Sequence, residues 1–547
     1  MKKVAFISVF NKEGVEKFAK GLVDLGWEIM SSSGTAKYLK DNGVSCTDLS
    51  SFVGEPILGH RVVSLSREFY AMLLARYDNE EDKKELEKLN LPFISLVCCD
   101  MYPLIEEIEK KDTTYEKVLE KTDIGGPTML RAAAKGERIV VCDKNDREKV
   151  LKWLQDDEID AKIFKRALAA KAEYIVSKYC MASAEYLSDG KYSGLIGEAT
   201  SICKYGENAW QTPAMLFKTY TTDTLAMANK NFKRVAGEPM SYNNMADLDR
   251  LLQTITHIAG GFDLNTKKVP FIAVGVKHGN PCGAAIGEDS SEVLEKMLSG
   301  DLRAIFGGLI MTNFKIGEKE ADTLLTFKMP EGKRRLLDGI FAPEFEENAI
   351  EKLKRKGDKC RFLANEALKN LSSNSLDKSF RFRYLRGGFL KQPNYTFVPN
   401  IKEATVEGDQ NIIKQDQIIV DLILAWAIGC TSNSNTITIV KNGKLIGNGV
   451  GQQDRVGAAK LAISRADDAA SVLEEKNIKA DLVGAIAYSD SFFPFPDGPK
   501  VLIERGIKII FTTSGSVNDK DVIESCKVEG ATLIMFPDKV ARGFAWH

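Results

Sequence analysis

Long hydrophobic runs are missing from this sequence of 547 residues. No stretch approaches the roughly 18 consecutive apolar residues that a transmembrane helix needs. The apolar run near the N-terminus ends at Asn11 and Lys12, so it predicts a first strand and not a signal peptide. The net charge of −1 gives no basic field of the kind that draws nucleic acid or an anionic membrane. We therefore expect a cytoplasmic protein with small-molecule partners, no nucleic acid and no membrane.

Metal-binding patterns are also absent. The ten cysteines include no CxxC pair, and Cys98 and Cys99 lie inside an apolar stretch, which favours reduced core thiols over disulfides or metal ligands. The zinc signature of nucleobase deaminases needs H-x-E and P-C-x-x-C. Pro281-Cys282 matches part of it, but Ala285 occupies the second cysteine position and no H-x-E occurs. We expect no catalytic metal.

Strands and helices alternate over the first 140 residues. The segments KVAFISVF, EIMSSSG, FISLVCCDMYPL and RIVVCDK are typical of strands, and GVEKFAKGLVDLG of a helix. This alternation predicts an α/β fold with a parallel sheet and crossover helices. Residues 144–196 are mostly helical and charged, which we interpret as a connector.

A second region begins near ICKYGENAWQTPA and continues with the strand PFIAVGVKHG. Within residues 290–385, AIFGGLIM and LDGIFAP are expected as buried turns, and residues 386–416 as polar, irregular chain. Beyond them, IIVDLILAWAIG predicts a helix and TITIVKNGKLIGNGVG a hairpin with an Asn-Gly turn. The chain is too long for one core, so two to four domains are expected. GVKHGNPCG and GNGVGQQDR resemble each other, but too slightly to prove an internal repeat.

Two loops in the first domain suit an anion. SSSGT (residues 32–35 with Ser31) follows a strand and opens a helix, where backbone N–H groups favour a phosphate, although a simple Ser/Thr helix cap is the alternative. DIGGPTMLRAAAK (residues 123–135) places a Gly-Gly turn at another predicted helix start. The two together favour a phosphorylated ligand.

Lys277 and His278 stand at the end of an apolar strand, where a core would hold neither. Histidine titrates near neutrality, and a desolvated lysine can also exchange a proton there. Small residues follow, so a ligand could approach the backbone. The pair is typical of a general acid–base site, against the alternative of a surface-turn lysine beside a hydrogen-bonded histidine.

The last third of the chain adds an arginine and an aromatic cluster. GQQDR carries Arg455, whose guanidinium suits a phosphate or carboxylate. YSDSFFPFPDG crowds three phenylalanines between Asp490 and Asp497, which could be core or a slot for a flat heterocycle.

With these motifs together, the chain resembles the family of bifunctional purine-biosynthesis enzymes AICAR transformylase/IMP cyclohydrolase. The resemblance spans nearly the full length and rests on the ordered motifs SVFNKEG, SSSGTAKYL, DIGGPTMLRAAAK, KYGENAWQTPA, SYNNMADLD, VKHGNPCGAA, FGGLI, DGIFAP, GQQDR, SDSFFPFPDG and TTSGSVNDKDVIE.

The resemblance implies three domains. Residues 1–197 would form a methylglyoxal-synthase-like parallel-sheet domain that closes the purine ring. Residues 198–385 and 386–547 would form two cytidine-deaminase-like α/β subdomains, without zinc, that transfer a formyl group from 10-formyltetrahydrofolate to AICAR. Formate as the donor and a bound monovalent cation stay open, and a homodimer is implied.

The resemblance also implies the residues of the transformylase site. Lys277 and His278 would be the catalytic pair, and Asn435 would steady the tetrahedral intermediate. The nucleotide and heterocycle contacts would come from Lys204, Tyr205, Gly307, Asp338, Arg455, Phe492 and Arg542. The folate contacts would come from Phe495, Asp497 and Phe544. Lys204 replaces the usual arginine and Trp210 the usual histidine of the family.

In the first domain the resemblance is weaker. The corresponding site residues are Lys12, Ser32, Ser33, Gly34, Thr35, Arg61, Ser64, Tyr102, Asp123, Gly125, Gly126 and Lys135. The family pattern GGRVKTLHPxxHxGIL becomes GHRVVSLSREFYAML, so Val63 replaces the loop lysine and Ser66 and Tyr70 replace two histidines. We predict slow or lost ring closure with nucleotide binding retained. The alternative for this domain is a nucleotide-binding regulatory or structural module. A separate alternative for the protein is a deaminase-like hydrolase, which requires metal.

Overall fold

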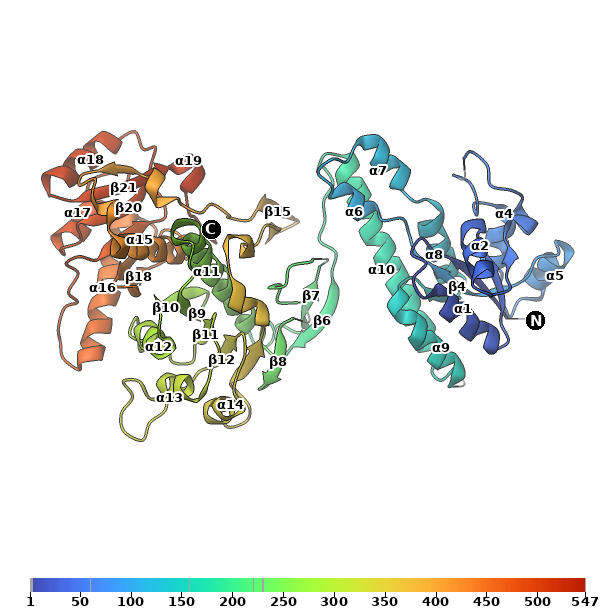
Figure 1. The fold of residues 1–547 in the computed structure, drawn as a ribbon, viewed down its shortest axis with the longest axis horizontal. Helices are drawn as coiled ribbons and strands as arrows, with labels where there is room; N and C mark the ends of the chain where they lie inside the picture. Colours follow the sequence, from blue (N-terminus) through green and yellow to red (C-terminus); the bar gives the residue numbers. More distant parts are fainter. Residues whose placement is uncertain (1–2, 60, 157, 220, 229–230, 547) are drawn as a thin grey trace. The chain divides into compact units, whose positions relative to one another are not determined.

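The computed structural model describes residues 3–59, 61–156, 158–219, 221–228 and 231–546. The chain forms two compact units, residues 1–196 and 197–547. Figure 1 shows the first in blue to cyan and the second in green to red. Each unit is described by itself.

Unit 1 is built on a parallel five-stranded sheet with the order β3-β2-β1-β4-β5. Its strands are β1 (Val4–Ser8), β2 (Glu28–Ser31), β3 (Thr47–Asp48), β4 (Ile94–Cys99) and β5 (Ile139–Val141). Its helices are α1 (Val15–Asp24), α2 (Ser33–Asp41), α3 (Ser50–Val53), α4 (Arg67–Leu74), α5 (Glu80–Lys88), α6 (Leu104–Ile108), α7 (Tyr115–Lys121), α8 (Gly125–Lys135), α9 (Arg147–Gln155) and α10 (Ala161–Leu187). The parallel α/β fold predicted for this region is confirmed.

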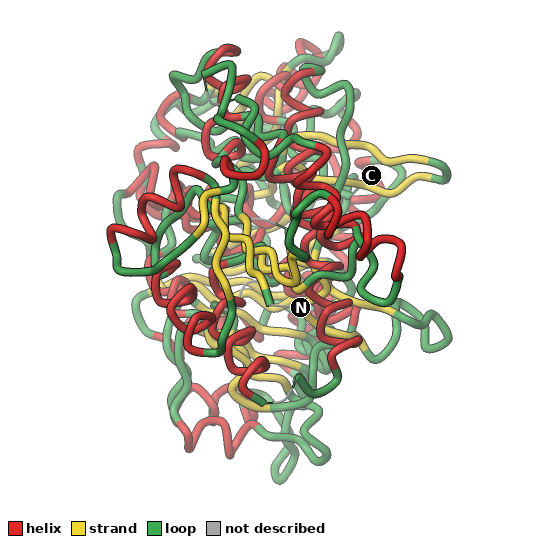
Figure 2. The backbone as a smooth tube through the Cα atoms, turned by 90° about the vertical axis from the view of Figure 1, so that its right-hand side faces the viewer, coloured by secondary structure: helices red, strands yellow, loops and turns green. Residues whose placement is uncertain are grey.

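Helices cover both faces of this sheet (Figure 2), as its continuous apolar strands require. Alternate strand residues enter two separate cores, one under α1, α2 and α9 and the other under α4 and α8. Helix α10 contributes Leu168 to the first core and Ala172 and Val176 to the second. The interpretation of residues 144–196 as a connector is therefore wrong, because α10 belongs to the packed interior of unit 1.

Unit 2 contains a 12-stranded mixed sheet with the order β16-β21-β20-β19-β17-β18-β10-β9-β11-β12-β13-β8. Its strands are β8 (Lys233–Ala236), β9 (Phe271–Lys277), β10 (Asn280–Gly287), β11 (Leu309–Thr312), β12 (Gly339–Ala342), β13 (Arg361–Ala364), β16 (Thr405–Glu407), β17 (Ile437–Lys441), β18 (Lys444–Gly449), β19 (Ile486–Ser489), β20 (Ile509–Ser514) and β21 (Thr532–Pro537). Two hairpins stand apart from it, β6 (Glu198–Cys203) with β7 (Ala214–Lys218), and β14 (Phe380–Leu385) with β15 (Gly388–Pro393).

The order of elements in unit 2 repeats. The helices are α11 (Tyr242–Thr266), α12 (Ser290–Leu298), α13 (Glu318–Thr326), α14 (Glu347–Leu353), α15 (Asp416–Gly429), α16 (Arg455–Glu474), α17 (Asp497–Glu504), α18 (Asp519–Val528) and α19 (Asp538–Ala541). A helix (α11 or α15) precedes a hairpin (β9–β10 or β17–β18), which is followed by three strands that alternate with helices. In each half the first hairpin strand is antiparallel to the next strand, and the last three strands are parallel. The halves join where β10 pairs with β18 in antiparallel fashion.

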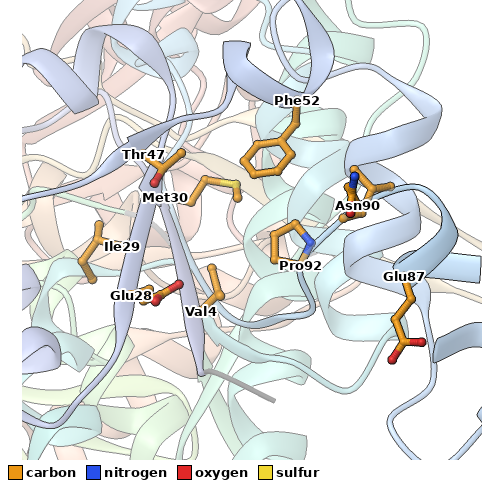
Figure 3. A pocket seen from close by; sticks show the side chains of 10 residues that line it. Val4, Glu28, Ile29, Met30, Thr47, Phe52, Glu87, Asn90 and Pro92 are labelled. Atoms are coloured by element: carbon orange, nitrogen blue, oxygen red, sulfur yellow. The ribbon is translucent and has the colours of Figure 1, made fainter. Parts of the chain in front are cut away.

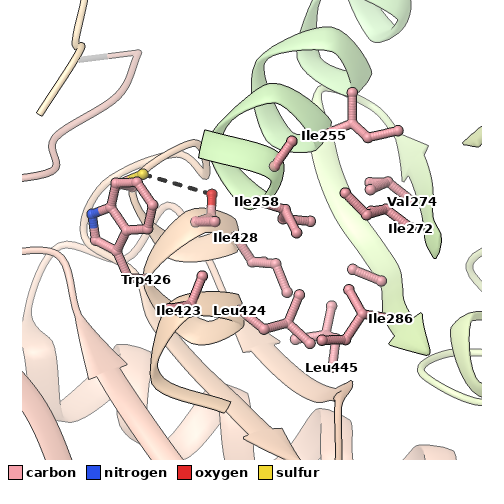
Figure 4. Close-up of a cluster of buried hydrophobic side chains, with 14 of the residues drawn as sticks. Ile255, Ile258, Ile272, Val274, Ile286, Ile423, Leu424, Trp426, Ile428 and Leu445 are labelled. Atoms are coloured by element: carbon pink, nitrogen blue, oxygen red, sulfur yellow. Dashed lines mark hydrogen bonds between the residues drawn. The ribbon is translucent and has the colours of Figure 1, made fainter. Parts of the chain in front are cut away.

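The central core of unit 2 lies under α11 and α15, on one face of the sheet. Figure 4 shows Ile255 and Ile258 of α11 meeting Ile428 of α15 above strand residues such as Val274 and Leu445. Helices α12–α14 and α16–α18 cover two further cores on the opposite face.

Three sequence expectations in unit 2 need correction. AIFGGLIM and LDGIFAP are not turns but contain the fully buried strands β11 and β12. Each strand has only four residues, and β11 follows Gly308 while β12 begins with Gly339, which made a turn the simpler interpretation. Residues 386–416 are not wholly irregular, because they include β15 and β16. The predicted Asn-Gly hairpin is confirmed, with φ of 53° at Asn442 and 71° at Gly443.

Candidate active sites

Lys277 and His278 lie at the hairpin between β9 and β10. Asn280 pairs with Lys277 across the hairpin, so His278 and Gly279 alone form the turn. Both have positive φ, 52° and 72°, as a type I′ turn requires. The turn leaves the His278 side chain exposed and Lys277 half-buried. The strand thus presents both proton carriers at its end instead of burying them.

The Lys277 ammonium reaches the loop before β11. Its Nζ donates a hydrogen bond of 2.6 Å to the Phe306 carbonyl. Gly307, which follows, has φ of 74°, and a Cβ built there would lie 4.0 Å from Nζ. The Asp338 N–H donates to the Gly308 carbonyl at 3.0 Å. The structure therefore brings Lys277, Gly307 and Asp338 together. The Asp338 carboxylate accepts a hydrogen bond from Arg355.

Asn435 lies in the second half of unit 2, just before β17. Its backbone exchanges hydrogen bonds of 3.1 and 3.2 Å with Gln452, and its Nδ2 donates to the Gln452 carbonyl at 3.0 Å. The neighbouring Asn433 N–H donates to Asn280 Oδ1 at 3.0 Å. Because Asn280 ends the Lys277–His278 turn, this bond ties the predicted catalytic residues of the two halves together.

A buried carboxylate, Asp490, organises the same region. It is 0% exposed and accepts hydrogen bonds from the Ser434 hydroxyl at 2.6 Å and the Thr436 N–H at 3.0 Å. Arg455 Nη2 lies 3.0 Å from its other oxygen. Burial raises the pKa of Asp490, and the Arg455 charge opposes that shift. The sequence predicted Arg455 as a nucleotide contact but gave Asp490 no role.

The phenylalanines of the predicted aromatic slot differ in burial, since some belong to the core and others lie at the surface. Phe493 is 2% exposed and belongs to the hydrophobic core, whereas Phe492 is half-buried and Phe495 is 59% exposed. Asp497 is exposed at the first position of α17, where it accepts from the Gly498 N–H.

Phe544 lies between two cations. The guanidinium of Arg542 is 5.0 Å from the centre of its ring, and that of Arg455 is 5.8 Å away. Arg542 also binds Asp538, whose other oxygen accepts from Ser491 and Thr513. Two arginines, each also paired with a carboxylate, flank one half-buried ring, where they can contact an anionic or π-rich ligand.

Lys204 and Tyr205 lie in the loop after β6. Lys204 is exposed and Tyr205 half-buried. The loop reaches the start of α11, where Asn243 Nδ2 donates to the Glu207 carbonyl at 3.2 Å. Trp210 in the same loop is 80% exposed. No contact among the described residues joins Lys204 to Lys277, so its predicted role stays a prediction.

In unit 1, the anion loop lies at the carboxyl end of β2. The Ser32 hydroxyl does not cap α2 but meets the Ser8 hydroxyl at 2.8 Å. Lys12 Nζ donates to Thr35 Oγ1 at 3.1 Å, and burial lowers the pKa of Lys12. The Ser33 hydroxyl donates to Asp48. A Cβ built at Gly34 would meet no neighbouring atom within 4 Å. The start of α2 thus lacks a side-chain cap and lies beside a lysine, with open space around Gly34.

The Gly-Gly loop lies at the start of α8. The Gly126 N–H donates to Asp123 Oδ1 at 3.0 Å, and a Cβ at Gly126 would lie 2.5 Å from the other carboxylate oxygen. A Cβ at Gly125 would lie 3.2 Å from Ser64 Oγ. Burial raises the pKa of Asp123 and of Tyr102. The glycines therefore allow the carboxylate and the Ser64 hydroxyl to approach the helix start.

Of the other predicted residues, Lys135 lies apart from this loop and Arg61 pairs with helix α7. Lys135 is the last residue of α8, ten positions from Gly125 and thus about 15 Å along the helix axis. Arg61 is exposed and binds Glu120.

The residues that replace the family histidines have structural partners. Ser66 caps α4, because its hydroxyl accepts the Phe69 N–H at 3.1 Å. Tyr70 packs edge-on against Phe69, and burial raises its pKa to about 12. A phenol with this pKa stays protonated near neutrality and cannot serve there as a general base.

The pocket in Figure 3 is not part of this site. Its cavity of about 530 Å³ is lined by Val4, Glu28, Met30, Thr47 and Pro92, among others. Most of them lie at or just before the first residues of the strands. This end of the sheet is opposite to the end that carries Ser32 and Asp123.

Two more findings concern the whole described chain. No group of three or more His, Cys, Asp or Glu side chains in the described ranges could hold a metal ion. In the same ranges, no helix has the length and apolar character to cross a membrane.

Comparison with protein families gives two matches. The family model described as AICARFT/IMPCHase bienzyme matches residues 133–465, and that of the MGS-like domain matches residues 14–128.

Curated relatives carry the name bifunctional purine biosynthesis protein PurH. Those from Caldicellulosiruptor saccharolyticus and Anoxybacillus flavithermus are each 33% identical, over 545 and 555 residues, and the one from Prochlorococcus marinus is 31% identical over 546 residues. Each alignment covers 98% of this chain and 98% of the relative. A solved structure, "Crystal structure of ForH", is 31% identical with a TM-score of 0.30, over 34% of this chain and 98% of that one.

Proposed function

The chain belongs to the AICARFT/IMPCHase bienzyme family, and from this membership we infer that it is an AICAR formyltransferase of purine biosynthesis. The family model covers 133–465, which includes Lys277, His278 and Asn435. The observation that carries the proposal is the hairpin turn that presents Lys277 and His278 side by side, tied through Asn280 to the segment of Asn435.

We propose that these three residues catalyse transfer of the formyl group from 10-formyltetrahydrofolate. The 5-amino group of AICAR is a weak nucleophile, since its lone pair is delocalised toward the carboxamide. His278 removes its proton, directly or through the carboxamide, as the nitrogen bonds to the formyl carbon. Lys277 stabilises the tetrahedral oxyanion or protonates the folate N10, which leaves as tetrahydrofolate. Asn435 donates to the same intermediate.

We assign nucleotide binding to the groups around this turn. Lys204, Tyr205, Gly307, Asp338, Arg455, Phe492 and Arg542 are the proposed AICAR contacts, and Phe495, Asp497 and Phe544 the proposed folate contacts. The two arginines at the half-buried Phe544 ring support an anionic and aromatic ligand there. The repeated element order of unit 2 supports its proposed division into subdomains 198–385 and 386–547.

The test is a formyl-transfer assay that follows formyl-AICAR and IMP separately. Lys277→Met and His278→Ala should each lower kcat by about 10²–10⁴-fold, the usual contribution of a positioned acid or base. Lys268→Met is the matched control. Lys268 is exposed, lies shortly before the first residue of β9 and binds Glu288. Full activity in both site variants would overturn the assignment. Running the assay with formate in place of the folate decides between the two donors.

For unit 1 we propose nucleotide binding with weak or absent IMP cyclohydrolase activity. The uncapped start of α2 and the Asp123 loop support binding. Val63 can neither donate a proton nor hold an anion, and Ser66 and Tyr70 serve α4. Formyl-AICAR should therefore accumulate ahead of IMP. Val63→Lys should raise ring closure about tenfold or more, since one charged contact contributes roughly 1.4 kcal/mol. No gain would favour a non-catalytic module.

We further propose a cytoplasmic homodimer. The β14–β15 hairpin supports a second copy as partner, because Phe380, Tyr384 and Leu390 are more than half exposed on it. We also propose that the protein binds a monovalent cation. A comparison of its melting temperature in potassium chloride with that in sodium chloride tests this.

A further inference from the structure

Two segments of unit 2 must keep a fixed relation if the proposed transfer is to work. One is the turn with His278, and the other is the segment 432–435 with Asn435. They lie more than 150 positions apart in sequence. Hairpin geometry fixes each segment locally, and the pairing of β10 with β18 joins the two hairpins at Ala285 and Lys444, away from both segments.

Asp247 of α11 holds the first segment. The Gly279 N–H donates to its Oδ1 at 2.6 Å. Burial raises the pKa of this carboxyl, while the N–H groups of Gly279 and His278 favour its ionised form. His278 has φ of 52°, a value that few residues other than glycine adopt, and the Asp247 hydrogen bond to Gly279 adds support to this turn.

Arg250, one helical turn further along α11, holds the second segment. It is 2% exposed, and its Nη2 donates to Asn433 Oδ1 at 3.1 Å. Its Nε and Nη1 have no hydrogen-bond partner among the described residues. The Trp546 ring lies 5.1 Å from the guanidinium. Burying a cation with so few hydrogen bonds costs free energy of folding. The side chain that Arg250 binds and orients, Asn433, is neutral.

Asn280 and Asn433 close these contacts into a ring. The chain of contacts runs from Asp247 through Gly279 to Asn280, across to Asn433, and back through Arg250 to α11. Asn448 reinforces it, since its Nδ2 donates to the Pro281 carbonyl and to Ser432 Oγ, both at 3.0 Å.

The helix that carries both residues is itself firmly held. Ser241 and Asn244 form a capping box at its start, and most side chains from Leu248 to Phe262 are buried. Two groups three positions apart on such a helix keep a constant spacing.

We propose that Asp247 and Arg250 are positioning residues, through which helix α11 sets the distance between the His278 turn and Asn435 during formyl transfer. This inference rests on the proposed function of that site. A displacement of about 1 Å can cost a rate factor of about 10², so the ring affects kcat more than substrate binding.

The experiment measures kcat and KM for AICAR in the full-length enzyme, with melting temperatures as a control for folding. Asp247→Ala and Arg250→Met should each lower kcat at least about tenfold and change KM less than about threefold. Asp247→Asn, which keeps an acceptor oxygen, should recover part of the loss. The double variant should lose less than the product of the single losses, because one break already opens the ring.

Two matched controls separate positioning from stability. Asp263→Ala removes a carboxylate from the far end of the same helix, where it accepts from Ser373 at 2.7 and 2.9 Å. Gly279→Ala strains the turn at φ of 72°, and Gly484→Ala places the same strain at φ of 75° away from it. Only Gly279→Ala should lower kcat, and Gly279→Asn, which tolerates this φ, should retain most of it.

The inference is overturned if Asp247→Ala keeps kcat within twofold of the native enzyme, or if Asp263→Ala lowers it equally. His278→Ala is run alongside. If His278→Ala stays active, the proposed site itself fails. If it is inactive while Asp247→Ala and Arg250→Met are not, only the positioning role fails.

Discussion

Single residues in this chain show how burial changes what a polar group can do. Asp490 and Arg455 form a pair in which the carboxylate is fully buried and the guanidinium side chain is 13% exposed. Such a pair contributes little net stability, but removing one partner leaves a buried charge without its counterpart. Because Ser434 and Thr436 also bind Asp490, the carboxylate shapes the segment that carries Asn435.

Asp490→Ala should therefore lower the free energy of unfolding by about 3–5 kcal/mol and also reduce kcat for formyl transfer. Chemical denaturation and steady-state kinetics measure the two effects. Asp467→Ala is the control, since Asp467 binds Arg505 at 2.8 Å with both side chains partly exposed and lies in α16 away from Asn435. Its expected cost is smaller than that of Asp490→Ala because both partners are partly exposed, with kcat unchanged. Equal losses in both variants would contradict the role given to Asp490.

At the scale of elements, turns and helix caps repeatedly set the orientation of side chains. The two type I′ hairpins of unit 2 occupy equivalent places in its halves, and one carries His278 where the other carries Asn442. In unit 1, Asn79 caps helix α5, because its side chain accepts the Asp82 N–H. Asp82 then binds Arg76 through backbone and side chain. These hydrogen bonds lower the pKa of Asp82 to about 2.

A carboxyl whose pKa is lower in the folded state than its usual 3.8 stabilises that state above pH 3.8. The contribution disappears as the pH falls from about 4 to about 2. We expect Asp82→Asn to reduce hydrogen-exchange protection of α5 at pH 7, with the difference from the native chain shrinking at pH 3. Exchange mass spectrometry of residues 80–88 measures it. A difference that grows as the pH falls would refute the assignment.

The exposed β14–β15 hairpin gives a prediction about assembly. Tyr384→Glu with Leu390→Glu places charges on side chains that are 81% and 55% exposed, so folding should be retained while dimers dissociate. Sedimentation velocity distinguishes the species. Val517→Glu, at a residue that is 99% exposed, should leave assembly unchanged. A native chain that sediments as a monomer would contradict the proposed homodimer.

At the scale of the whole molecule, the chain contains two units with separate cores and separate candidate sites. A ligand that binds only the folded form raises stability by about 2.7 kcal/mol at 100 times its Kd. AICAR should therefore increase hydrogen-exchange protection in residues 197–547 and IMP in residues 1–196. Protection of unit 1 that IMP leaves unchanged would refute nucleotide binding there.

In unit 2, sequence patterns predicted elements with a local signal well and elements that depend on distant neighbours poorly. The strands β9 and β17 and helix α15 follow from local apolar runs, and Asn442-Gly443 follows from turn chemistry. The strands β11 and β12 were missed because four buried residues beside glycine resemble a turn. Their strand character comes from neighbours far away in the chain, β9 and β13.

The sequence by itself determined the α/β class of unit 1, the family and the candidate pair Lys277 and His278, because these depend on local periodicity and on contiguous motifs. Only the tertiary structure decided that Asp247 and Arg250 of one helix meet two distant loops, that Asp490 is buried against Arg455, and that Ser66 caps α4. Those roles arise from long-range contacts between strand ends and helix faces, and no local pattern specifies which ends meet.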